Sequence, residues 1–155
     1  LHRHVEKQAD GYLKKAAGPY NPSTKYGGPE TIALKNRYVK EHASGQYRGF
    51  VAGDGIAQAE GYFEKWYGPE ALKWLEQFRK RKNDALGVLA TVDMAAQELC
   101  AAGREVTVPA IKGVLAADKE WKQKLSQPEF SDRSIAAAIE ESARLFGLGV
   151  AETQA

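Results

Sequence analysis

Three histidines are the side chains most suited to acid–base or metal chemistry in this chain of 155 residues. His2 and His4 stand two residues apart beside the first residue, and His42 lies at the end of an expected helix. No Ser or Cys accompanies them at the spacing of a nucleophile and its base, and a two-residue spacing suits a metal only where a strand or a third ligand fixes it. We therefore expect hydrated histidines and no metal site.

Glu60 and Glu64 are the carboxylate pair with the best spacing for acid–base work. They stand at positions i and i+4 of an expected helix beside Tyr62 and Trp66, which could line a cleft, although most such pairs are simply hydrated. The turn at residues 53–55 lacks the Gly-Lys-Ser/Thr run and the preceding apolar strand of a phosphate loop. We predict a protein that is not an enzyme and needs no cofactor.

Positive charge gathers in the first half of the chain, where residues 1–84 hold 15 basic and 10 acidic side chains against 7 and 10 in residues 85–155. The densest cluster is the basic run Arg79-Lys80-Arg81-Lys82. On successive helical positions these four cations would encircle the helix, so the run favours a hydrated helix end. Contact with phosphates, together with Lys65 and Lys73, is the alternative.

Residues 95–115 have the most distinctive pattern in the chain. An Ala/Leu helix reaches Gly103, and Thr107 then caps a second helix that Ile111 and Leu115 anchor. This segment resembles the helix-turn-helix of plasmid KfrA-type N-terminal DNA-binding domains over about twenty residues. A helical hairpin with a Gly turn also occurs in bundles that bind nothing, and that alternative stays open.

The resemblance implies a second helix set into the major groove of DNA, with Thr107, Ala110, Lys112 and Gly113 facing the groove. Phosphate contacts would come from nearby cations and from the basic run. The predicted DNA-binding residues are Arg104, Thr107, Lys112, Lys119, Lys122, Lys124, Arg79, Lys80, Arg81 and Lys82.

Aromatic residues suggest a second function, since 12 of the 15 precede residue 84. Amphipathic helices bury about one stripe each, so some of these rings should stay exposed and bind a partner. The predicted partner-binding residues are Tyr20, Tyr26, Tyr62, Trp66 and Tyr67. The chain would then be a structural or assembly subunit of a larger complex, such as a phage, respiratory or photosynthetic assembly. Packing of these rings onto their own loops is the alternative.

Composition limits the class of protein. With 43% apolar and 27% charged residues the chain falls in the globular range, and its single cysteine, Cys100, excludes a disulfide framework and is expected to be a small buried thiol. No apolar run approaches the roughly 20 residues that span a bilayer, and residues 1–7 lack a signal-peptide core. We expect a soluble protein, which would be cytoplasmic if it binds DNA and organellar if Leu1 marks a processed subunit.

Helix signals dominate the rest of the sequence. Pro29 and Pro69 each follow a Gly and precede a Glu, which predicts helix starts and helices over 29–43 and 69–82. Further helices are expected over 56–67, interrupted at Gly61, and over the ranges 85–102, 107–115, 118–125 and 131–146. Residues 18–28 and 47–55 read as loops.

No segment alternates with the period of a strand. The sequence therefore predicts an all-α fold of five to seven helices in a single domain over residues 1–155, with a helix-turn-helix-like hairpin in its C-terminal half. Whether residues 28–43 and 68–83 are a true repeat stays open, because helices that begin with Pro look alike for physical reasons alone.

Overall fold

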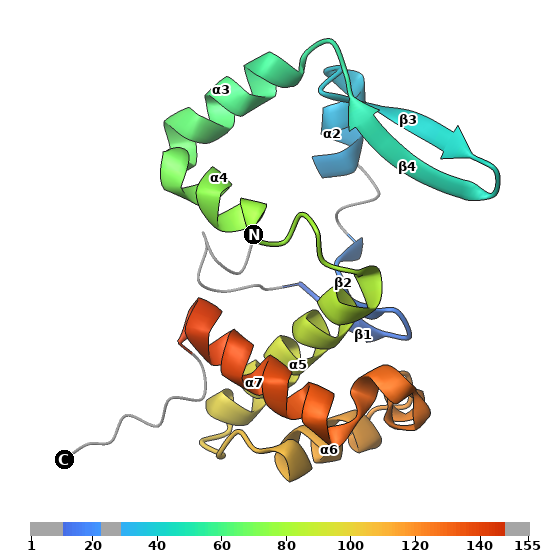
Figure 1. Cartoon of the computed structure of the whole chain (residues 1–155), viewed down its shortest axis with the longest axis vertical. Coiled ribbons are helices and arrows are strands. Elements are labelled where there is room, and N and C mark those ends of the chain that lie inside the picture. Colours follow the sequence, from blue (N-terminus) through green and yellow to red (C-terminus); the bar gives the residue numbers. More distant parts are fainter. Residues whose placement is uncertain (1–10, 23–28, 148–155) are drawn as a thin grey trace. The chain divides into compact units, whose positions relative to one another are not determined.

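A computed structural model describes residues 11–22 and 29–147 of the chain (Figure 1). The chain divides into two compact units. In the described ranges, unit 1 comprises residues 21–79, and unit 2 comprises residues 11–20 and 80–147. That the chain forms one domain stays a prediction.

The all-α prediction is wrong, because two antiparallel two-stranded sheets accompany six α-helices in the described ranges. One sheet lies in each unit. The fold is therefore mixed, with helices predominating.

Unit 2 is built on three helices, α5 (Asn83–Ala101), α6 (Val108–Ala117) and α7 (Asp132–Phe146). Their predicted positions are confirmed, and so are their end signals. The Thr107 hydroxyl accepts a hydrogen bond from the Ala110 amide at 3.2 Å, and Gly103 and Gly147 both adopt the positive φ that ends a helix cheaply. Residues 118–125 differ from the prediction, because they form a turn and part of the 3₁₀ helix η2 (Lys122–Ser126), followed by η3 (Pro128–Phe130).

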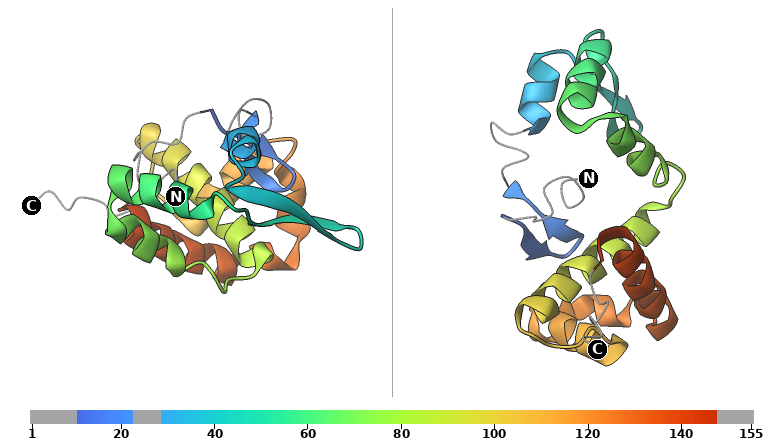
Figure 2. Two further views of the ribbon diagram at one scale, coloured as in Figure 1. Left: turned by 90° about the horizontal axis from the view of Figure 1, so that it is seen from above. Right: turned by 90° about the vertical axis from the view of Figure 1, so that its left-hand side faces the viewer.

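The core of unit 2 lies between these helices and centres on Trp121, which is fully buried. Its largest fully buried apolar neighbours are Leu99, Ile111, Leu115, Ile135 and Val92. The Trp121 indole N–H donates to the Lys15 carbonyl at 2.9 Å, which ties the core to the hairpin of β1 (Leu13–Lys15) and β2 (Gly18–Tyr20). β2 in turn packs on α5 (Figure 2).

Unit 1 contains α2 (Pro29–Lys35), β3 (Val39–Ser44), β4 (Tyr47–Ala52), α3 (Ile56–Tyr67) and α4 (Pro69–Glu76). The helices predicted over 29–43 and 69–82 thus begin as expected but end at Lys35 and Glu76. Helix α3 runs through Gly61 without interruption. Residues 47–52, expected to be a loop, form a strand.

The hairpin of β3 and β4, called the ribbon below, was missed because its pattern is not amphipathic. Every ribbon residue except Val39 is exposed, so neither face needs the apolar alternation that marks a half-buried strand. The turn itself is conventional: Ser44 pairs with Tyr47 around two residues, and Gly45 takes the positive φ that a type II′ turn requires at its first central position.

Two glycines close the base of the ribbon. The Gly53 amide donates to the Tyr38 carbonyl at 2.9 Å, and the Gly55 amide donates to the Arg37 carbonyl at 2.8 Å. A Cβ at Gly53 would collide with the Arg37 carbonyl oxygen, so the chain can cross there only as glycine. Arg37 itself is the one non-glycine residue of the described ranges with positive φ, at 59°.

Candidate partner-binding surface

The segment that resembles a helix-turn-helix forms α5, a connection of six residues and α6. Ile111, Val114 and Leu115 bury the inner face of α6. Its outer face consists of Pro109, Gly113 and Ala116, with Lys112 half-exposed. These small side chains offer few groups that read base edges.

Lys124, which the sequence predicts to contact phosphate, lies in the interior of unit 2. The side chain is buried, its Nζ donates to the Ala16 carbonyl at 2.7 Å, and the ammonium lies 5.0 Å from the centre of the Phe130 ring. Burial lowers the pKa of Lys124, while the Glu129 charge raises it by less. This lysine holds the β1–β2 turn on unit 2.

Three further predicted DNA-binding residues are engaged within the protein. Lys112 Nζ lies 2.9 Å from Asp132 Oδ1, Arg81 pairs with Glu141, and Thr107 caps α6. The exposed members of the set are Arg104, Lys119, Lys122, Arg79, Lys80 and Lys82, of which Arg79 pairs with Glu76 at 2.9 Å. The glutamate raises the pKa of Arg79 through the hydrogen bond and its charge.

The basic run is not helical, contrary to the sequence interpretation. Helix α4 ends at Glu76 and α5 begins at Asn83, so residues 79–82 occupy the turn and extended chain between these helices. The four cations therefore do not encircle a helix.

Three of the predicted partner-binding residues lie on α3, where the Tyr67 ring contacts Phe63 with 5.0 Å between the ring centroids. Tyr62 is 49% exposed, Trp66 is 74% exposed and Tyr67 is 46% exposed. Tyr62 and Trp66 stand four residues apart and so share one face of the helix. Tyr20 is exposed on β2, in unit 2, and Tyr26 lies outside the described residues.

Unit 1 buries very little apolar surface, which its sequence does not predict. Ala71 is the only buried hydrophobic residue among its described residues, and α3 has no buried residue at all. Leu72 and Leu75 of α4 are also exposed, and neither was predicted to bind a partner. We call the exposed side chains of Tyr62, Trp66, Tyr67, Leu72 and Leu75 the aromatic surface. Their helical periodicity resembles that of core residues, so no sequence signal separates the two roles.

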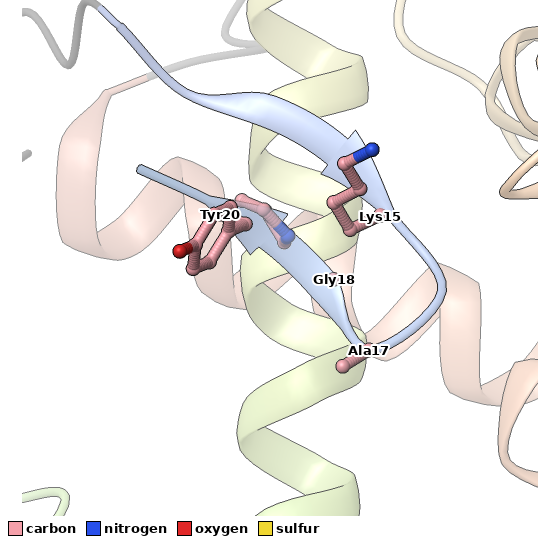
Figure 3. A pocket seen from close by; sticks show the side chains of 5 residues that line it. Lys15, Ala17, Gly18 and Tyr20 are labelled. Atoms are coloured by element: carbon pink, nitrogen blue, oxygen red, sulfur yellow. The ribbon is translucent and has the colours of Figure 1, made fainter. Parts of the chain in front are cut away.

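A shallow cavity of about 320 Å³ lies at the β1–β2 hairpin of unit 2. Its lining residues are Lys15, Ala17, Gly18, Pro19 and Tyr20, four of which Figure 3 labels along the hairpin. A Cβ at Gly18 would meet the buried Thr91 hydroxyl at 3.6 Å, and that hydroxyl oxygen has no hydrogen-bond partner. The lining offers no arrangement of groups that would select a ligand class.

The described ranges were also searched for metal-ion sites and membrane-spanning helices. They contain no group of three or more His, Cys, Asp or Glu side chains placed to hold a metal ion. Cys100 is exposed, not buried as expected. No α-helix between residues 29 and 147 combines the length and apolar character needed to cross a membrane.

Comparisons of the chain with protein-family models, with curated proteins and with solved structures gave no match. The resemblance of residues 95–115 to KfrA-type domains stays a prediction.

Proposed function

We propose that this chain is a non-catalytic subunit that docks onto a protein partner through the aromatic surface. The observation that supports this function is the missing core of unit 1, whose described residues bury one alanine while five large side chains of α3 and α4 face solvent. Soluble monomers rarely leave clustered apolar side chains uncovered, because each costs free energy in water. A partner that covers them recovers this free energy.

The charges around the aromatic surface indicate what that partner presents. Residues 54–76 carry five carboxylates and two lysines. Two of these charges already compensate each other, since Lys73 Nζ lies 3.3 Å from Glu70 Oε1. Glu76 is compensated as well, by Arg79 at 2.9 Å. The segment that carries the aromatic surface keeps a net negative charge, which suits an apolar stripe flanked by Lys and Arg, as on an amphipathic helix.

Trp66 is the side chain expected to dominate the interface. Buried Trp and Tyr anchors at the centre of an interface typically cost 2 kcal/mol or more when truncated, which weakens binding by roughly 30-fold. Because Trp66 is exposed in the chain alone, its loss leaves the folding free energy nearly unchanged.

Trp66→Ser tests the proposal. A tagged chain is used to co-purify a stoichiometric partner, and the dissociation constant of the purified pair is then measured for the wild type and each variant. Leu13→Ser is the matched control, because it removes an apolar side chain that is 49% exposed in unit 2. We expect Trp66→Ser to weaken binding at least about 30-fold and Leu13→Ser to leave it unchanged.

Two outcomes would contradict the proposal. Equal affinity of Trp66→Ser and the wild type would show that the partner binds elsewhere. A fall of several degrees in the unfolding midpoint of Trp66→Ser would show that the ring belongs to a core.

DNA binding through residues 104–124 is the other proposal that the sequence supports. Its support is reduced, since Lys124 is buried and Lys112 is paired, while Arg104, Lys119 and Lys122 stay exposed. We therefore place docking onto a protein ahead of it.

A further inference from the structure

We propose that the ribbon is a binding site for duplex DNA, with β3 and β4 entering the major groove and Lys40 contacting phosphate. This inference does not depend on the aromatic surface, and it uses none of the residues that the sequence predicted to bind DNA. It follows from the register of the strands, their exposure and the distribution of charge.

The register separates the ribbon into two faces of different charge. Residues directly opposite each other in an antiparallel pair share a face. The pairs Lys40–Val51, His42–Gly49 and Ser44–Tyr47 therefore form one face, which we call the cationic face because it has no carboxylate. An anion that approaches it meets Lys40 without a competing negative side chain.

The opposite face is electrically compensated. It consists of the pairs Val39–Ala52, Glu41–Phe50 and Ala43–Arg48. Arg48 Nη2 and Glu41 Oε2 lie 3.5 Å apart on the diagonal of this face. The uncompensated positive charge of the two strands is thus that of Lys40.

The ribbon is also unusually accessible. All residues from Lys40 to Ala52 are exposed, and within the described ranges both outer edges lack a neighbouring strand. Figures 1 and 2 show the ribbon extending from unit 1 beyond α2. Its base is held by the hydrogen bond between Gly53 and Tyr38. Isolated two-stranded hairpins are marginally stable in water, so a ligand that covers the cationic face would stabilise it.

Charge and shape together favour duplex DNA over a protein partner. Residues 35–52 contain four Lys and Arg side chains and one glutamate, whereas residues 54–76 of the same unit are acidic. The major groove of B-form DNA, about 12 Å wide, admits a two-stranded ribbon, and such ribbons read bases in known complexes. Gln46 at the exposed tip has the amide that pairs with adenine, and Tyr47, 75% exposed, has a hydroxyl for phosphate or base contact.

The number of cations sets the expected salt dependence. Lys40 is the one lysine or arginine of the cationic face. One phosphate neutralised by it gives a slope of about −1 in log affinity against log salt concentration, so binding should weaken roughly 3- to 4-fold between 50 and 200 mM salt.

Fluorescence anisotropy of a labelled 20-base-pair DNA duplex with the full chain tests the proposal. Lys40→Glu reverses a charge on the cationic face, and Arg133→Glu is the matched control, because it makes the same charge reversal at an exposed residue of α7. We expect Lys40→Glu to weaken binding at least 10-fold and to flatten the salt slope, while Arg133→Glu stays within about 2-fold of the wild type. Trp66→Ser should bind the duplex normally, which separates this proposal from docking onto a protein.

Several results would overturn the proposal. These are no binding at 50 mM salt, equal losses for the two charge reversals, or tighter binding of an RNA duplex of the same sequence, whose major groove is too narrow for the ribbon. Circular dichroism of both variants verifies that the fold is retained. If Lys40→Glu unfolds the chain, Lys40→Gln replaces it, and unchanged affinity of Lys40→Gln also refutes the inference.

Discussion

Substitution of Lys124 by methionine separates a structural role from a DNA-binding role. Methionine keeps the length and apolar contacts of the lysine stem but removes the ammonium that donates to the Ala16 carbonyl at 2.7 Å. Hydrogen bonds from charged donors contribute about 1.5–3 kcal/mol, and relief of the buried charge offsets part of that. We expect a net loss of about 1–2 kcal/mol in the free energy of unfolding, and thus a midpoint lower by roughly 3–6 °C.

Lys122→Met is the control for this prediction, since Lys122 is exposed on the same 3₁₀ helix. Thermal unfolding followed by circular dichroism should place it within about 0.5 kcal/mol of the wild type. If Lys124→Met is as stable as Lys122→Met, or loses DNA affinity without losing stability, the assignment of Lys124 to the fold is refuted.

Two more predictions concern pH and the ribbon base. Burial lowers the pKa of Lys124 from its ordinary value of 10.5, so just below that pH the unfolded state binds more protons than the folded state. The free energy of unfolding of the wild type, relative to that of Lys124→Met, should therefore rise as the pH approaches 10.5. Urea titrations at several pH values measure this difference, and a constant difference would contradict the prediction. Gly53→Ala should destabilise the ribbon by about 2–3 kcal/mol, because the added Cβ meets the Arg37 carbonyl, and its amides should lose their protection against hydrogen exchange. In the control Gly49→Ala the added Cβ meets nothing within 4 Å, so the ribbon amides should stay protected. Equal exchange rates in both variants would refute the reasoning.

The helices of unit 2 could be predicted because their end signals are local. Thr107 and Ser131 each accept a hydrogen bond from an amide three residues later, and Gly103 and Gly147 supply the positive φ after their helices. These groups act within one turn, so the residue types alone carry the information. The contacts of Lys124 could not be predicted, because its partner Ala16 lies 108 positions away in the chain.

The ribbon illustrates a different limit of sequence reasoning. Alternation of apolar and polar residues indicates a strand with one buried face, and a strand that buries neither face does not show this alternation. Gly45 between Ser44 and Tyr47 was the available signal, since a glycine between two short segments that contain Val and aromatic residues favours a hairpin. Helix α3 runs through Gly61, where an interruption was predicted. One glycine in a helix costs about 1 kcal/mol, which the neighbouring helical turns can compensate.

The two units differ in how much apolar surface they bury. Unit 2 surrounds Trp121 with buried side chains from three helices, and that burial accounts for its fold. The described part of unit 1 has regular helices and a fixed ribbon base, yet buries almost no apolar side chain. Secondary structure without a core gains little stability from burial, so its exposed aromatic and cationic groups are better explained by binding than by folding. Residues 35–52 hold four Lys and Arg side chains and one glutamate, whereas residues 54–76 hold five carboxylates and two lysines. The two surfaces that we propose in this unit therefore suit ligands of different charge.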